Sequence, residues 1–257
     1  MFRLIRITIL LYVLLCVALA SYVTRSVASD WSRTLWINVY PINGDQHPAT
    51  AEYIASLDRD SFADIERFFE REAERYGWDT RQPVRVHLSH EVAERPDSPP
   101  FDGSVLARIR WSLGIRWWSM QVTDDSDTPT PDVRAFFVLY QPDGSPVLES
   151  SVGLRKGMIS VVNAYADRRY RGSNNVILTH EILHTLGATD KYDPATNLPF
   201  HPNGFAEPDR VPLLPQRRAE IMGGRVPIEP TRAEIPRSMK QVVIGPATAL
   251  EVGLTKP

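Results

Sequence analysis

The chain has 257 residues, of which 43% are hydrophobic and 23% are charged, and its formal net charge is -2. This length and composition are those of one sizeable globular domain, or of two lobes that share a cleft, and the near-neutral charge gives no reason to expect a nucleic acid as a partner. The single cysteine, Cys16, excludes an intrachain disulfide and a cysteine-based zinc site.

Residues 1–25 are expected to be a membrane anchor or a signal peptide. Arg3 and Arg6 precede an uncharged stretch over 7–24, whose 18 residues are near the lower limit for a membrane-spanning helix. The positive end is expected to stay in the cytoplasm, which places the rest of the chain outside the cytoplasmic membrane, in the periplasm or beyond. The Ala-Leu-Ala sequence at 18–20 also resembles a signal-peptidase site, so secretion after cleavage is the alternative.

Residues 26–257 are expected to form one α+β domain. Alternating hydrophobicity predicts strands, and a period near 3.6 residues predicts helices. The predicted strands are 33–42, 83–92, 132–142, a more polar one after a turn within 142–154, and 156–165. The predicted helices are 58–78, 173–187, a helix that runs into an irregular aromatic segment within 104–120, and a weaker one near 246–253. The first strand–helix–strand unit predicts a right-handed crossover and a parallel strand pair.

The predicted helix 173–187 carries the chemistry of the chain. It has Ser173 or Asn174 as a candidate cap and Gly187 as its stop. His180 and His184 are four residues apart, so both imidazoles can point at one metal ion from the same helix face. Glu181 lies about 100° further round the helix, close enough to contact a metal-bound water without binding the ion itself. This combination is typical of metal-assisted hydrolysis, with the glutamate as general base.

A catalytic zinc site needs a third protein ligand, and Asp190 is the first candidate. Gly187 allows a sharp turn after the helix, so the chain can double back and bring Asp190 to the same ion. Glu207 and Glu220 are the alternatives, as in sites that use a distant glutamate. The other nearby candidates are His201, in a loop that is expected to border the cleft, and Asp193, which is expected to support the loop. The upstream histidines are expected to be structural or exposed: His47, His87 and His90.

The segment HEILHTLGATD resembles the extended motif HExxHxxGxxH of the metzincin zinc peptidases. Its final aspartate is most similar to the snapalysin branch, small secreted bacterial metalloendopeptidases with HExxHxxGxxD. Metzincins also carry a methionine in a tight turn beneath the metal, and the segment AEIMGG at 219–224 resembles that turn, with Met222 as the methionine. The motif resemblance covers about 18 positions, and none of them lies within residues 31–172.

The resemblance implies a metzincin-like zincin fold with a twisted mixed sheet over the active-site helix and an irregular lower lobe. The upper lobe would be about 31–187 and the lower lobe about 188–257. It implies a Zn²⁺ cofactor and a peptide or protein substrate, whose backbone would pair with the exposed edge strand 147–154. It also implies that Tyr192 hydrogen-bonds the oxyanion of the tetrahedral intermediate.

Three functions fit these residues. The first is a zinc-dependent metalloendopeptidase tethered by its N-terminal helix outside the cytoplasmic membrane. The second is a zinc amidase that acts on cell-wall peptides, and the third is a non-catalytic zinc-binding interaction protein. The presence of Glu181 disfavours the third, because a structural metal site has no use for a general base. The arginine- and tryptophan-rich segment 108–120 is expected to pack in the core and to form a partly exposed lip that can face a membrane.

Overall fold

The structure, a computed structural model, describes residues 5–8, 10–12, 15, 30–100, 103–123, 130–143, 148–155 and 157–256. Within these ranges there is no helix that is both long enough and apolar enough to cross a membrane. Residues 5–8 and 10–12 are helical and exposed. Most of the predicted anchor, including Cys16, lies outside the described residues, as do 144–147 and Lys156 from the predicted strands.

A five-stranded mixed sheet with the strand order β2-β1-β3-β5-β4 forms the centre of the fold. Its strands are β1 (Leu35–Asn43), β2 (Val84–Leu88), β3 (Val133–Tyr140), β4 (Val152–Leu154) and β5 (Ile159–Tyr165). β1 pairs in parallel with β2 and β3, and β3 pairs in parallel with β5. The parallel pair that the sequence predicts is therefore confirmed. β4 alone is antiparallel to its neighbour β5 and forms one edge of this sheet.

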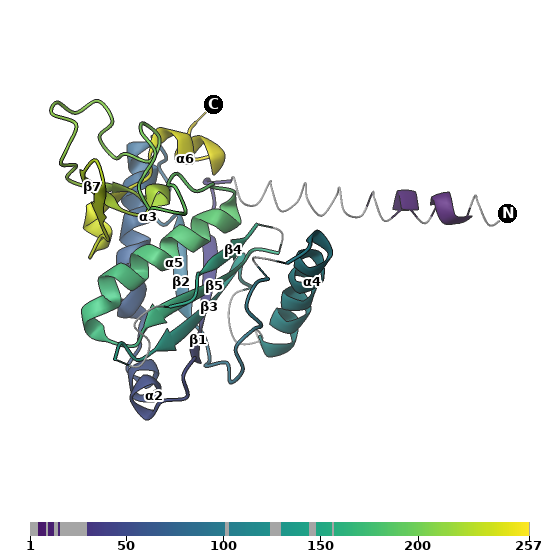
Figure 1. The fold of residues 1–257 in the computed structure, drawn as a ribbon. Coiled ribbons are helices and arrows are strands. Elements are labelled where there is room, and N and C mark those ends of the chain that lie inside the picture. Colours follow the sequence, from purple (N-terminus) through teal and green to yellow (C-terminus); the bar gives the residue numbers. More distant parts are fainter. Residues whose placement is uncertain are drawn as a thin grey trace.

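Helices cover both faces of the sheet (Figure 1). α3 (Ala63–Arg75) and α5 (Arg171–Leu186) pack on one face and α4 (Val105–Val122) on the other. The strands alternate accordingly: Phe137 of β3 belongs to the α3/α5 side and Phe136 to the α4 side. The face of α3 that the sequence predicts is buried as expected; it consists of Ile65, Phe68, Phe69 and Ala73.

Four details of the secondary structure differ from the sequence prediction. The aromatic part of α4 is not irregular but continues the helix to Val122, because Trp118 and its neighbours gain helical order by packing on the sheet. α5 begins at Arg171, so neither Ser173 nor Asn174 caps it; the Asn174 side chain instead donates to the Tyr165 carbonyl at 2.8 Å. Of the described residues of the polar strand predicted within 142–154, only Val152–Leu154 form a strand, β4. The short helix α2 (Pro48–Ala55), capped by His47, is absent from the prediction.

A C-terminal lobe of short elements follows α5. It contains β6 (Ala219–Glu220), β7 (Val226–Glu229), β8 (Arg232–Glu234), β9 (Val242–Val243) and α6 (Pro246–Glu251), of which the last fits the weak helical signal. The buried Glu72 of α3 accepts a hydrogen bond from the Ile244 amide at 3.0 Å and forms an ion pair with Arg75 at 2.7 Å. Trp31 donates its indole proton to the Val252 carbonyl at 2.9 Å. These contacts fix the lobe against α3 and against the segment that precedes β1.

Gly153 of β4 lies in close contact with α5. A Cβ atom at this position would lie 2.3 Å from the Glu181 carbonyl oxygen and 2.6 Å from the His184 Cβ atom. Only glycine therefore lets the strand lie directly against the turn of α5 that carries the histidines and the glutamate.

We expect Gly153→Ala to lower the free energy of unfolding by about 1–3 kcal/mol, since overpacking of this kind displaces backbone. Gly114→Ala on α4 is the matched control, because a Cβ there meets no atom within 4 Å. The control should be neutral or more stable by about 0.5–1 kcal/mol, as for any exposed helical glycine. Urea unfolding curves of both variants measure this difference; equal effects would contradict the close approach.

Candidate metal centre

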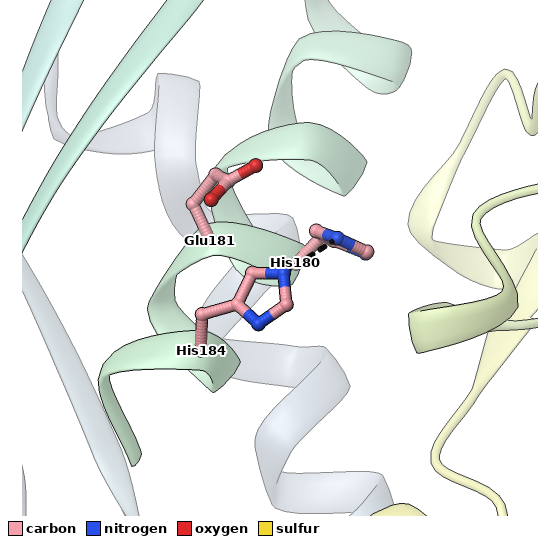
Figure 2. A group of neighbouring side chains, drawn as sticks. All are labelled: His180, Glu181 and His184. Carbon is pink, nitrogen blue, oxygen red and sulfur yellow. Dashed lines mark hydrogen bonds between the residues drawn. The ribbon is translucent and has the colours of Figure 1, made fainter. Parts of the chain in front are cut away.

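One turn of α5 brings together His180, Glu181 and His184 (Figure 2). Their ligand atoms all lie within 4.8 Å of one another. His180 and Glu181 are buried, and His184 is partly buried. The three residues follow the HExxH pattern, so the helical spacing that the sequence predicts places them as a candidate metal site.

Backbone carbonyls orient both imidazoles. His180 Nδ1 lies 2.9 Å from the Ile221 carbonyl oxygen, and His184 Nδ1 lies 2.9 Å from that of Ala188. A carbonyl accepts only, so each Nδ1 carries a proton and donates it. In the neutral ring this leaves the Nε2 lone pair free for a metal, which is the usual arrangement of metal-binding histidines. Gly187 makes the second contact possible: its φ of 112° turns the chain back after the helix, as the sequence predicts.

The turn at Gly187 places Asp190 against both histidines. Its Oδ1 atom lies 3.1 Å from His180 Nε2 and 3.2 Å from His184 Nε2, and the two Nε2 atoms are 3.1 Å apart. Three ligand atoms at about 2.0–2.1 Å from a tetrahedral ion lie about 3.3 Å from each other. The nearly equilateral triangle of two nitrogens and one oxygen therefore fits one face of a tetrahedral metal site, with the fourth direction left for water or substrate.

The electrostatics of this triangle favour a cation. Burial by itself would lower the pKa of His180, but the hydrogen bond to Asp190 and the charge of Glu181 raise it to about 9. Burial opposes the charge of Asp190 as well, yet the hydrogen bonds from His180 and His184 hold the pKa of its carboxyl well below its usual range. The carboxylates create a local negative potential in which a divalent ion can replace the proton between the three ligand atoms.

Glu181 lies next to both histidines on α5 (Figure 2), with a carboxylate oxygen within 4.8 Å of their ring nitrogens. Burial raises the pKa of this carboxyl, and the two histidine charges partly offset that effect. A buried carboxylate with a raised pKa takes up a proton more readily than an exposed one. That property suits a general base.

A cleft of about 340 Å³ opens over His180 and Glu181, which line it together with Tyr192. Its remaining walls consist of Ser150, Ser151, Val176, Ile177, Asn197, Ile221, Gly223, Gly224, Arg225 and Ile235.

Tyr192 of this cleft lies close to the metal-site helix: its ring centroid is 6.3 Å from that of His180. Burial, the charges of Asp190 and Glu181, and a hydrogen bond with Asp190 raise the pKa of Tyr192 to about 12. Its hydroxyl therefore stays protonated at neutral pH, and in this structure it donates that proton to Asp190.

A tight turn over Ile221–Gly223 lies beneath the histidines. Its Ile221 carbonyl holds His180, and its Met222 carbonyl accepts from the Lys191 amide at 2.9 Å. Met222 is fully buried in the main core. A second methionine is close to the metal-site helix as well: the Met239 sulfur lies 3.9 Å from the Thr179 hydroxyl. Met222 thus occupies the turn that the sequence assigns to it, and its role beneath a metal stays a prediction.

The alternative ligands have other partners. Glu220 is fully buried, and its carboxylate accepts hydrogen bonds from the amides of Gly223 and Gly245 and from the Thr248 hydroxyl, at 2.8, 2.9 and 2.7 Å. It therefore braces the turn below the histidines. Glu207 accepts from the Arg217 amide at 3.1 Å.

The remaining polar candidates also make contacts outside the triangle. Asp193 accepts from the Ala195 amide and the Thr196 hydroxyl within its own loop. The ring of the exposed His201 lies 3.2 Å from the Pro208 carbonyl. Upstream, His47 caps α2 and the exposed His90 lies 3.0 Å from the Val122 carbonyl, which fits their expected structural roles; His87 is a partly buried residue of β2.

Lys191 is a supporting residue that the sequence does not point to. It is buried, and its ammonium group binds Glu251 of α6 at 2.7 Å and the Thr189 carbonyl at 2.9 Å. The backbone amide of Lys191 also donates a hydrogen bond to the Met222 carbonyl. Lys191, the neighbour of Asp190, is therefore held by both its side chain and its backbone. No local pattern predicts such a contact, because Glu251 is 60 residues away in the sequence.

Neither a scan against protein-family models nor a search of curated proteins finds a match for this chain. The candidate site is therefore defined by its own geometry: an HExxH group on a helix, a carboxylate that completes a triangle, and a cleft beside an edge strand.

Proposed function

We propose that this chain is a zinc-dependent metalloendopeptidase of the metzincin type, in the snapalysin-like variant with an aspartate as third ligand. The observation that carries the proposal is the triangle of His180 Nε2, His184 Nε2 and Asp190 Oδ1, with sides of 3.1–3.2 Å. Nitrogen and carboxylate ligands in this geometry match zinc, which prefers tetrahedral sites and, in catalysis, keeps one position open.

When bound, the ion would polarise the scissile carbonyl and make an attacking water more acidic. Glu181 accepts the proton of that water and passes it to the leaving amine, so that a neutral amine is released. Tyr192, whose hydroxyl bonds Asp190 in this structure, would exchange that partner and donate its proton as a hydrogen bond to the developing oxyanion. The Ile221 and Ala188 carbonyls keep the two imidazoles in the tautomer that leaves Nε2 unprotonated.

A peptide in extended conformation is the substrate that suits the shape of the site. β4 is an edge of the sheet and lies against the turn of α5 that carries Glu181 and His184, and Ser150 and Ser151 just before it line the cleft. An exposed strand edge binds an extended peptide through backbone hydrogen bonds. Such binding would present a peptide bond to the metal without selecting one particular side chain.

The proposed location is outside the cytoplasmic membrane, with residues 1–25 as a single membrane anchor or, alternatively, a cleaved signal peptide. The support for this location is the sequence alone: two arginines followed by an uncharged apolar stretch.

Removal of the metal provides the first test. We expect the purified chain to hydrolyse an unfolded protein, to lose this activity on treatment with a chelator, and to regain it when stoichiometric Zn²⁺ is added. Peptide release and bound zinc are measured on the same samples. Activity that survives complete removal of the metal would contradict the proposal. If cell-wall fragments are cleaved and unfolded protein is not, the amidase is the correct function; if zinc binds and neither substrate is cleaved, the chain is a zinc-binding interaction protein.

A further inference from the structure

Helix α4 has apolar side chains on two opposite sides. The inner side packs on the sheet through Trp111, Ile115 and Trp118. The outer side carries large hydrophobic side chains that are mostly exposed: Val105 63%, Leu106 77%, Ile109 50%, Leu113 59%, Trp117 65% and Met120 70%. At about 100° per residue these six positions fall within an arc of roughly 120°. We call this arc the outer face of α4.

The outer face is unusual for a surface helix. Surface helices are normally polar on the side away from the core, and a helix that is apolar all round is normally buried. Isolated exposed hydrophobic residues need no explanation, whereas a contiguous exposed stripe marks a binding surface. All six side chains of the outer face are at least half exposed among the residues that the structure describes.

The charges of α4 indicate the chemistry of the partner. The helix contains Arg108, Arg110 and Arg116 and no acidic residue between Val105 and Val122. Arg110 is exposed and lies near one border of the arc on a helical projection, whereas Arg116, near the other border, is partly buried. A second copy of the same face would bring these positive charges against each other, which disfavours a symmetric dimer through α4. An apolar stripe bordered by arginines and containing a tryptophan fits an anionic phospholipid surface.

We propose that the outer face of α4 inserts into the interface of an anionic phospholipid bilayer. Leu106, Leu113 and Met120 enter the boundary between headgroups and acyl chains, Trp117 lies at the headgroup level, and the exposed Arg108 and Arg110 bind lipid phosphates. α4 and α5 cover opposite faces of the sheet (Figure 1). Docking through α4 therefore leaves the cleft over α5 open to a substrate in solution.

A fluorescent label on the outer face tests this proposal. The full chain carries Cys16→Ser together with Leu113→Cys and is labelled with an environment-sensitive nitrobenzoxadiazole group. The matched control carries Cys16→Ser with Glu70→Cys, an exposed position on α3, on the other side of the sheet. Both proteins retain the predicted N-terminal anchor, so its insertion affects them equally. Vesicles are made of phosphatidylcholine with phosphatidylglycerol, or of phosphatidylcholine alone.

We expect a several-fold rise in emission from position 113 on anionic vesicles, quenching by brominated acyl chains, and no such change from position 70. Arg110→Glu in the Leu113→Cys background should reduce the rise on anionic vesicles more than on neutral ones. Unchanged emission from position 113 on vesicles to which the protein is attached overturns the proposal. A rise that occurs without lipid and depends on protein concentration also overturns it, since a second copy then covers the face. An equal rise on both vesicle types, insensitive to Arg110→Glu, overturns the role of the arginines.

Discussion

Glu181→Gln is expected to abolish most of the hydrolysis while the protein keeps its metal. Loss of a positioned general base typically lowers kcat by about 10²- to 10⁴-fold. Glutamine has nearly the same shape as glutamate but does not accept a proton. Since Glu181 lies beside the ligand triangle rather than in it, the two histidines and Asp190 remain available for the ion.

The measurement pairs kcat on an unfolded protein substrate with zinc content after dialysis. Gly114→Ala serves as the control, because this position on α4 lies across the sheet from the cleft and its activity should equal that of the wild type. A Glu181→Gln variant that loses zinc would instead make Glu181 a ligand. One that keeps both zinc and activity would remove Glu181 from the catalytic step.

The local part of the site follows directly from the sequence. The spacing of His180, Glu181 and His184 defines one face of a helix, and Gly187 marks where the chain reverses, because a φ of 112° is rarely adopted by any other residue. These features depend on residues within one or two turns of each other. The helical spacing and the glycine therefore predict them.

The supporting contacts do not follow from the sequence, because they join distant segments. The carbonyl that holds His180 comes from Ile221, 41 residues away, and the carboxylate that fixes Lys191 comes from Glu251. The role of Gly153 also depends on the packing of β4 against α5, which no pattern in a three-residue strand reveals. The aromatic part of α4 likewise packs on the sheet through Trp118, a contact between distant segments that the local sequence does not show.

Zinc binding should depend on Asp190 and not on Glu207. We expect Asp190→Ala to lower zinc affinity by more than about 100-fold, since loss of a partner outside the ligand shell already costs about 10- to 100-fold. The physical reason is the geometry: Asp190 Oδ1 is the third corner of the triangle, 3.1 and 3.2 Å from the two imidazole nitrogens. Glu207→Ala should leave zinc affinity unchanged, because its carboxylate accepts from the Arg217 amide.

Competition with a chromogenic zinc chelator measures both affinities, and urea unfolding shows that each variant is folded. Asp190→Ala removes a hydrogen bond and a negative charge that raise the pKa of His180. In the metal-free variant the pKa of His180 should therefore be lower than in the wild type. Zinc that is retained by Asp190→Ala and lost by Glu207→Ala would reverse the assignment. If both variants retained zinc, the protein ligands would be the two histidines alone. That result would contradict a catalytic zinc site with three protein ligands.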